Sequence, residues 1–492
     1  MGKKNYGKVL PIGIITLSLI ILFLPHLLRL SSGNEQLVGS KTYYHLLKTS
    51  DENIENDELV IGSRPAEFNP YYIFIRKLSA FIPLLLLARY LPILFGVLSV
   101  FLLYLILRKH GIGVIQANLS VLIFVLSPTF IFVFTTFEPL SFLFLTSLIG
   151  FFLLVHGKKW SFYMSLPFFL AIPLFGKLES LTLVILLLIY SFLKKENAKQ
   201  IAIIITLILL VFLLIQVPFY STYGYPEKAE ISSKGLLTNY VSEFGSIYGF
   251  SSFSIIIALG GFVVLWSRKN KNILPYLLIL IIFISSLFFE ETRLYVSILY
   301  SLFGGFCLVT LVRYKWELEI VKIFTFILIF CGLIFSTTIF IQRLSLAEPS
   351  QGVYDSLVWL RANTNDNDVV FSHYSNGFFI ESIAGRKVIL DEKFDYTPNI
   401  NERLRNSKTI FYSRNLEATK QALQKYNISY IWINDKMKNG LVWRKSDEGL
   451  LFLFSNRRTF INVYNESGIE IWKVLELTQN LNKKQGKPVL QK

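Results

Sequence analysis

The chain has 492 residues, of which 53% are hydrophobic and 44 are phenylalanine, and its formal net charge is +16. Its apolar residues form blocks of near-membrane thickness separated by short clusters of Lys, Arg, Gly and Pro, which excludes an ordinary soluble protein. The basic residues lie in the short turns between the blocks, so they indicate membrane topology rather than a nucleic-acid partner.

The first apolar block follows Lys3, Lys4 and Lys8 and lacks a small-residue cleavage site, so we predict a retained first helix. Ten further blocks follow it, and together they predict about eleven membrane-spanning helices. The cysteines Cys307 and Cys331 lie inside such blocks, which excludes a disulfide framework and a Cys-based metal site. The predicted spans are 9–30, 84–107, 114–134, 139–155, 161–175, 179–193, 200–219, 251–267, 273–289, 294–312 and 319–341.

Basic clusters occupy alternate connections, including Arg108-Lys109, Lys158-Lys159 and Lys194-Lys195. The positive-inside rule makes these connections cytoplasmic. The first loop, 31–83, and everything after about residue 342 then face outward. The chain is therefore expected in the cell membrane as a multi-pass protein with a cytoplasmic N-terminus and an extracytoplasmic C-terminal domain.

From about residue 350 the apolar runs shorten to four to six residues and alternate with helical patterns, which predicts an α/β domain. Domain boundaries follow: a helical membrane domain over 1–343, a soluble domain over 344–477 and a disordered tail over 478–492. The predicted helices are 352–362 and 416–426, and the predicted strands are 369–372, 388–390, 428–433, 450–454, 460–464 and 470–474.

Candidate chemistry lies in the outward connections, because an ionisable group at that depth is costly without a partner or a water-filled cavity. A carboxylate can deprotonate an incoming nucleophile or bind a divalent cation, and Lys or Arg can neutralise a phosphate. We select Glu67 and Glu138 as candidate acids, and Lys177 and Arg293 as candidate phosphate ligands. Glu138 could instead only cap the helix that it precedes.

Three segments resemble the C-type glycosyltransferases, and among them archaeal relatives of the oligosaccharyltransferase catalytic subunit. The first loop contains Tyr43-Tyr44-His45, the next stretch contains Phe68-Asn69-Pro70-Tyr71-Tyr72, and the second outer loop ends at Glu138-Pro139. This resemblance implies transfer of a sugar from a polyprenyl-phosphate-linked donor, substrate contacts by Tyr44 and His45, and a divalent cation such as Mg²⁺ or Mn²⁺.

Two features depart from the family pattern. Ser40 and Lys41 stand where the family has its first-loop acid, which Glu35 or Glu67 could replace. The acceptor-binding Trp-Trp-Asp-Tyr-Gly signature is reduced to its glycine in His373-Tyr374-Ser375-Asn376-Gly377. These departures argue against a sequon-reading enzyme and leave a glycan, lipid or protein acceptor open.

The leading hypothesis is an inverting hexosyltransferase in contact with membrane lipid. The alternative is a non-catalytic relative whose outer domain binds a glycan or a protein. A transporter is disfavoured, because it would show paired repeats and mid-membrane charges, whereas these charges gather at the outer ends of the helices.

Overall fold

The computed structural model describes residues 6–51, 56–65, 69–230, 235–267 and 273–475. The chain divides into two compact units. The helical unit comprises residues 1–32, 69–222 and 233–346, and the mixed unit comprises 33–68, 223–232 and 347–492. The first outer loop up to residue 68 therefore groups with the C-terminal residues, a connection that the sequence did not indicate.

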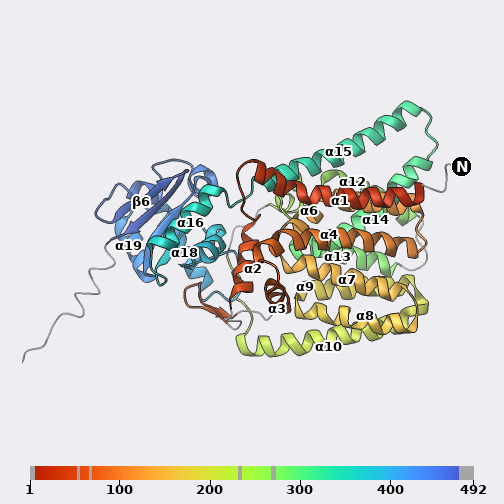
Figure 1. Ribbon diagram of the computed structural model, residues 1–492, viewed down its shortest axis with the longest axis horizontal. Coiled ribbons are helices and arrows are strands. Elements are labelled where there is room, and N and C mark those ends of the chain that lie inside the picture. The colour runs from red at the N-terminus through yellow and green to blue at the C-terminus, as the bar shows by residue number, and fades with distance from the viewer. Residues whose placement is uncertain (1–5, 52–55, 66–68, 231–234, 268–272, 476–492) are drawn as a thin grey trace, which may run out of the picture. The chain divides into compact units, whose positions relative to one another are not determined.

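The helical unit consists of apolar helices that run side by side (Figure 1). Its helices are α1 (Tyr6–Ser31), α3 (Pro70–Ser79), α4 (Leu84–Lys109), α5 (Val114–Val125), α6 (Pro128–Thr135), α7 (Pro139–Val155), α8 (Lys159–Ala171), α9 (Lys177–Leu193), α10 (Ala198–Tyr223), α11 (Leu236–Tyr240), α12 (Ser252–Ser267), α13 (Leu274–Phe288), α14 (Arg293–Arg313) and α15 (Glu319–Ser345).

Five helices of the described residues are long and apolar enough to cross a membrane, namely α1, α4, α10, α14 and α15. The predicted span over 114–134 is instead broken into α5 and α6, which are bent by 61° and would count as a sixth. Pro128 explains the break, because proline disfavours helical geometry at the preceding residue. The other predicted spans correspond to helices of 13 to 17 residues, so the count of eleven stays a prediction.

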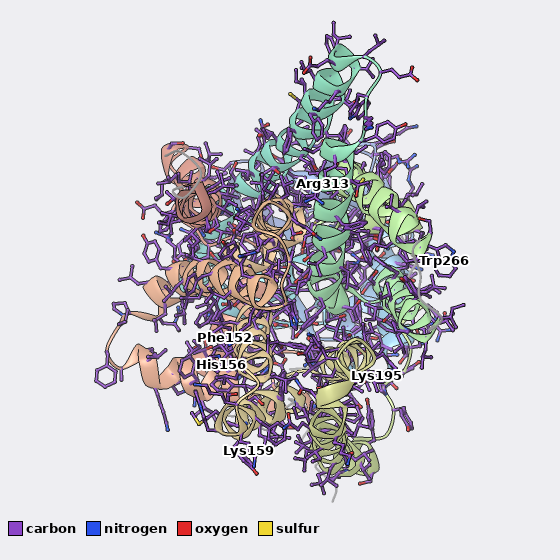
Figure 2. The ribbon with its side chains drawn as sticks, turned by 90° about the vertical axis from the view of Figure 1, so that its right-hand side faces the viewer. Phe152, His156, Lys159, Lys195, Trp266 and Arg313 are labelled. Carbon is purple, nitrogen blue, oxygen red and sulfur yellow. The ribbon has the colours of Figure 1, made fainter. Side chains whose placement is uncertain are left out.

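Several basic turns of the helical unit meet at one end of it (Figure 2). The view shows His156, Lys159, Lys195 and Arg313 on the face toward the viewer, although they come from three separate stretches of the chain, around residues 156–159, 195 and 313. Lys109, at the end of α4, bonds to His156 of the α7–α8 connection, and the His110 ring contacts Tyr190 of α9. This clustering is the arrangement that the charge pattern predicts for a cytoplasmic face.

The mixed unit is built on a five-stranded sheet with the order β4-β3-β5-β7-β6. β3 pairs in parallel with β4 and β5, whereas β7 is antiparallel to both β5 and β6. Its strands are β3 (Val369–Phe371), β4 (Lys387–Val388), β5 (Ile428–Ile433), β6 (Phe460–Glu466) and β7 (Ile469–Val474), and its helices include α2 (Ser40–Ser50), α16 (Gln351–Asn363), α18 (Ile400–Tyr412), α19 (Leu416–Lys425) and α20 (Gly449–Leu453). A two-residue pair, β1 (Asn56–Asp57) with β2 (Arg64–Pro65), lies in the first loop.

One predicted strand of the mixed unit is wrong. Residues 450–454 form α20 and its last turn instead of a strand. Leu450, Leu453 and Phe454 are buried while Phe452 is half exposed, so burial follows a helical spacing rather than an alternating one. Phe454 stacks on Trp472 with ring centroids 4.1 Å apart, which fastens the short helix to the sheet.

Candidate functional site

Glu138 immediately precedes α7, whose first residue is Pro139. Its side chain makes no capping hydrogen bond to that helix, so the simple capping role considered from the sequence does not account for it. The carboxylate is 5% exposed and accepts a hydrogen bond from the Tyr248 hydroxyl. Because a buried carboxylate needs compensation, Tyr248 is part of what keeps this acid in place.

Tyr248 belongs to the connection between α11 and α12, and this connection is fixed at several points. Arg343 of α15 donates to the carbonyl oxygens of Ser242, at 2.8 Å, and Ser246, at 2.7 Å. Thr129 of α6 donates to the carbonyl oxygen of Gly249 at 2.9 Å. Tyr248 was not predicted as a site residue, because a tyrosine near the membrane interface is usually only an interfacial anchor.

Arg293 begins α14 and is only 2% exposed. Its guanidinium donates to the carbonyl oxygens of Ser286, at 2.9 Å, and Asn239, at 2.8 Å, and lies 5.6 Å from the Tyr240 ring centre. Tyr248 lies within electrostatic range of both Glu138 and Arg293. The helical unit therefore brings the predicted acid and the predicted phosphate ligand to one neighbourhood.

Burial raises the pKa of the Tyr248 hydroxyl well above its usual range, and Glu138, Glu290 and Glu291 raise it further. Tyr248 therefore stays protonated and remains a hydrogen-bond donor to Glu138. Glu290 and Glu291, in the exposed turn before Arg293, add two more carboxylates to this neighbourhood.

Lys177 begins α9, as predicted, at a helix junction. Its ammonium group lies over two aromatic rings near the end of α10, 5.1 Å from the Phe219 centre and 5.0 Å from the Tyr220 centre. α9 packs against the 290–292 turn that leads into Arg293. The electron-rich faces of the two rings attract the ammonium group and partly replace its water. The ammonium group can still bind an anion.

Tyr44 and His45 lie on α2 in the mixed unit, so they are in a different unit from Glu138, Lys177 and Arg293. Tyr44 is buried, accepts a 3.3 Å hydrogen bond from Lys393 and packs on the Phe378 ring at 4.7 Å. Burial, with the charges of Lys41 and Lys393, lowers the pKa of His45 to about 3. His45 is thus a neutral imidazole at physiological pH.

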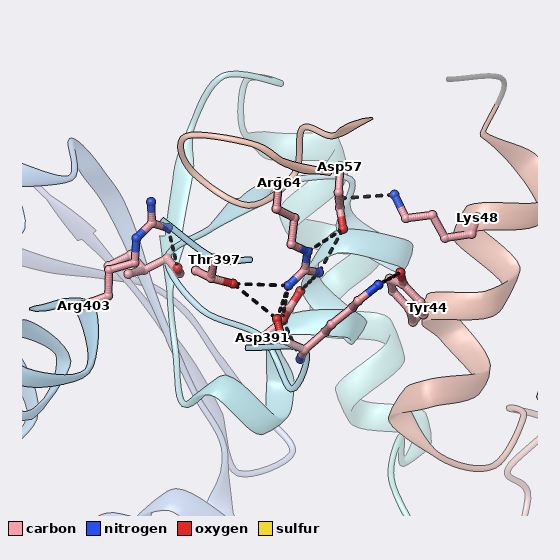
Figure 3. Close-up of polar contacts among 9 residues, drawn as sticks. Tyr44, Lys48, Asp57, Arg64, Asp391, Thr397 and Arg403 are labelled. Atoms are coloured by element: carbon pink, nitrogen blue, oxygen red, sulfur yellow. Dashed lines mark hydrogen bonds and ion pairs between the residues drawn. The ribbon is translucent and has the colours of Figure 1, made fainter. Parts of the chain in front are cut away.

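A buried charge network, which we call the Arg64 cluster, joins the first loop to the C-terminal part of the mixed unit (Figure 3). Arg64 pairs with Asp57 at 2.9 Å and with Asp391, and Lys48 pairs with Asp57 at 3.3 Å. All four side chains are nearly inaccessible. Arg64 lowers the pKa of Asp57 despite its burial, and Lys48 contributes to the same shift.

Of the predicted residues, Glu67 lies outside the described part of the chain. The same part contains no group of three His, Cys, Asp or Glu side chains arranged to hold a metal ion. Asp57 and Asp391 face Arg64 and Lys48, so their charge is already compensated by side chains. Within the part of the chain that the structure describes, these two carboxylates are therefore arranged as partners of cationic side chains and not as a metal site.

Comparison with solved structures identifies the fold of the chain. No protein-family profile and no curated protein sequence matches the chain. The archaeal oligosaccharyltransferase AglB from Archaeoglobus fulgidus, in complex with an inhibitory peptide and a dolichol-phosphate, is similar over 98% of this chain and 75% of its own, with a TM-score of 0.64 and 12% identity. An Archaeoglobus fulgidus oligosaccharyltransferase in the apo form gives a TM-score of 0.65 over 88% of this chain and 71% of its own, at 14% identity.

A second solved protein supports the same assignment. ArnT from Cupriavidus metallidurans, bound to undecaprenyl phosphate, is similar over 95% of this chain and 98% of its own, with a TM-score of 0.54 and 12% identity. The chain has the C-type glycosyltransferase fold. The resemblance predicted from the Tyr43-Tyr44-His45 and Glu138-Pro139 segments is thereby confirmed at the level of the fold.

A divalent metal has been observed with this fold. One Archaeoglobus fulgidus oligosaccharyltransferase structure contains Zn and sulfate, with a TM-score of 0.62, 14% identity, and coverage of 94% of this chain and 73% of that one. At these identities the likeness concerns the fold, so it does not transfer a metal site to particular residues of this chain.

Proposed function

We propose that this protein is a membrane glycosyltransferase that transfers a sugar from a polyprenyl-phosphate-linked donor to an acceptor at the outer membrane face. The fold supports this reading, since it is shared with proteins solved with dolichol-phosphate and with undecaprenyl phosphate. The proposed acceptor is a glycan, a lipid or a protein. The outward orientation rests on the basic turns at one end of the helical unit.

The observation that carries the proposal is the buried Glu138 carboxylate, which Tyr248 contacts in the same neighbourhood as Arg293. Glu138 makes no side-chain capping bond to α7, and its carboxylate accepts a hydrogen bond from Tyr248 of another connection instead. Hydrogen bonds from Arg343 and Thr129 fix the connection that carries Tyr248. A preorganised site requires support of this kind.

The chemistry follows from these groups. The acceptor's nucleophilic atom forms a bond to the anomeric carbon of the donor sugar while the bond from that carbon to the phosphate oxygen breaks. The electron pair of the broken bond leaves on the polyprenyl phosphate, whose negative charge Arg293 and Lys177 neutralise. The proton of the acceptor passes to a carboxylate. Attack from the side opposite the phosphate inverts the anomeric centre.

The test is transfer by the full-length protein reconstituted in lipid nanodiscs. Undecaprenyl-phosphate and dolichyl-phosphate donors carrying tritiated mannose or glucose are supplied with membrane extract as the acceptor source. Glu138→Gln is expected to slow transfer by about 10²-fold or more, the usual contribution of a general base or a charge-stabilising group.

Glu319→Gln is the matched control, because Glu319 is an exposed glutamate at the start of another helix of the same unit, α15. It should transfer at the wild-type rate. Equal rates for Glu138→Gln and the wild type would remove Glu138 from the site. Absence of transfer by the wild type from all four donors would contradict the proposed function.

One observation favours the non-catalytic alternative. Ser40 stands at the expected position of the first-loop acid, and the buried first-loop acid Asp57 is engaged by Arg64 and Lys48. A protein of that kind would retain a lipid-linked sugar in the nanodisc without turnover. Binding of the tritiated donors without product release would therefore identify it.

A further inference from the structure

The triplet Asn-x-Ser, in which x is not proline, is the acceptor for N-linked glycans on chain segments that face outward. It occurs three times in this chain, at Asn118-Leu119-Ser120, Asn427-Ile428-Ser429 and Asn465-Glu466-Ser467. So short a motif also arises by chance, so the fold has to decide which copy a glycosylating enzyme can reach.

The copy at Asn118 lies inside the helical unit. Asn118 and Ser120 belong to α5, and only 2% and 0% of their surfaces are exposed. An added Cβ at Gly305 of α14 would lie 2.1 Å from the Ser120 hydroxyl oxygen, so α14 covers that hydroxyl directly. The packing of α5 therefore excludes a glycan at this position.

The copy at Asn427 runs into the middle of the sheet. Asn427 itself is exposed, but Ile428 begins β5 and is completely buried, and Ser429 lies within that strand. β5 pairs with β3 on one side and with β7 on the other. An enzyme that reads Asn427 and Ser429 together would have to pull a central strand out of the sheet.

The copy at Asn465 lies at the end of β6, which is an edge strand of the five-stranded sheet. Asn465, Glu466 and Ser467 are all exposed. Ser467 and Gly468 form the two-residue turn into β7 with φ angles of 51° and 75°, and Asn465 pairs with Glu470 across it. Positive φ at both turn residues is typical of a tight hairpin. The triplet therefore protrudes at the tip of a hairpin.

The residues beside Asn465 fasten this hairpin to α16. Tyr464 packs on Trp359 of α16, with ring centroids 5.3 Å apart, and an added Cβ at Gly352 of α16 would lie 2.7 Å from the Ser467 Cβ. Successive side chains of a strand point to opposite faces, so Asn465 points away from the face on which Tyr464 contacts α16. The hairpin is held in place while the Asn465 amide stays accessible.

We infer that Asn465 carries an N-linked glycan and that Asn118 and Asn427 do not. The inference goes beyond the proposed transferase activity and requires only that the mixed unit face outward. Among the described residues, β6 has a strand partner only on its β7 side. A bulky glycan at its end would shield this open edge from pairing with another chain.

The glycan comes from a lipid-linked oligosaccharide, and the cell's own N-glycosylating transferase attaches it. The side-chain amide nitrogen of Asn465 forms a bond to the anomeric carbon of the oligosaccharide. The bond from that carbon to the phosphate oxygen breaks, and its electron pair leaves on the lipid phosphate. The amide nitrogen gives up one proton to a basic group of the transferase.

Translation of the full-length chain with endoplasmic-reticulum microsomes tests the inference, because the microsomes supply the lipid-linked oligosaccharide and the transferase. The wild type should migrate more slowly in gel electrophoresis, by one glycan, than the same protein after peptide N-glycosidase treatment. Asn465→Gln should abolish this difference completely, whereas Asn118→Gln and Asn427→Gln should retain it. Retention of the difference in Asn465→Gln, or its loss in Asn427→Gln, would overturn the assignment.

Ser467→Gly separates recognition of the triplet from misfolding of the hairpin. It removes the hydroxyl that the acceptor triplet requires, and glycine adopts the positive φ of this position without strain. The variant should therefore fold normally and lose the glycan. A glycan that persisted in Ser467→Gly would show that Asn465 is not modified as an Asn-x-Ser acceptor.

Arg444→Asn distinguishes a failure of this site from a failure of the orientation. It creates a new Asn-x-Ser triplet with Ser446 in an exposed stretch of the mixed unit, so it should add a second glycan. If only the new triplet were glycosylated, the Asn465 site would fail while the outward orientation stood. If neither were glycosylated, the outward orientation would fail too, and with it the proposed reaction at the outer membrane face.

Discussion

Arg64 shows how much one side chain can organise in this protein. It is fully buried and contacts Asp57 from the first loop together with Asp391 from the C-terminal part of the mixed unit. The sequence placed Arg64 in a polar loop, where an arginine is ordinarily solvated. Only the folded chain brings two acids from positions 334 residues apart (391 minus 57) to the same guanidinium.

Replacing Arg64 by methionine should therefore be strongly destabilising. The change leaves Asp57 and Asp391 buried without their main counterion, at a cost of about 3–5 kcal/mol. Hydrogen exchange followed by mass spectrometry on the full-length protein should show faster exchange in peptides from the 391–397 turn.

Arg414→Met provides the comparison. Arg414 pairs with Asp447 at 3.3 Å, but both side chains are more than half exposed. Its loss should cost less than about 1 kcal/mol, because water and salt screen such pairs. Equal effects of the two substitutions would show that the Arg64 cluster is not energetically distinct from a surface pair.

Glu381 gives a pH-dependent prediction. It is completely buried, and burial together with Asp391 and Asp57 raises its pKa well above the usual range, against the opposing charge of Arg64. The folded state therefore holds a proton that the unfolded chain releases above about pH 4.3. The contribution of Glu381 to the free energy of unfolding is fully present below that pH, and it is lost as the pH rises toward the folded-state pKa.

Glu381→Gln removes this titration, so the variant should gain stability relative to the wild type as the pH rises from about 5 to 8. Tryptophan fluorescence during urea unfolding at each pH measures the difference. Asp57 acts in the opposite direction, because its lowered pKa supplies stability that is lost as the pH falls, and it is common to both proteins. A constant difference across the range would show that Glu381 is ionised in the folded protein.

Packing between helices depends on glycine at specific contacts. On α12, an added Cβ at Gly261 would lie 2.0 Å from the carbonyl oxygen of Phe303 on α14. On α14, an added Cβ at Gly305 would lie 2.1 Å from the Ser120 hydroxyl oxygen of α5. Small residues at helix contacts let the backbones approach closely, which is a main source of association within a membrane.

Gly261→Ala should consequently separate α12 from α14 and cost about 1–3 kcal/mol. Thermal unfolding in detergent micelles measures the effect as a lowered Tm. Gly13→Ala on α1 is the control, since nothing lies within 4 Å of an added Cβ there. A Tm for Gly261→Ala that matches that of Gly13→Ala would mean that the helices adjust without loss.

Four elements of the mixed unit show what a sequence pattern can predict and what it cannot. The helix over 352–362 and the strand over 428–433 follow from strong periodic patterns, and the structure has both. The run over 450–454 is short and apolar, so it fits a strand or a helix equally, and packing against Trp472 made it helical. The helix α18 was not predicted, because its mean hydropathy is low and its apolar positions are sparse.

Orientation in the membrane is the prediction for the whole molecule. In a protein whose Cys307 and Cys331 are replaced by serine, Lys159→Cys should react with an impermeant maleimide only after the cells are permeabilised. Asp447→Cys, an exposed position of the mixed unit, should react in intact cells. The physical reason is that Lys and Arg are retained on the cytoplasmic side. The reverse labelling pattern would invert the proposed orientation.

The sequence by itself determined that this is a multi-pass membrane protein. Each apolar block and each basic turn contributes to membrane insertion through its own composition, without help from distant residues. It also identified Glu138, Lys177 and Arg293 as charges at helix junctions, where the structure has them. The tertiary structure decided their partners. Tyr248 on Glu138 and Glu392 on Ser40 are contacts between residues more than a hundred positions apart, which no local pattern encodes.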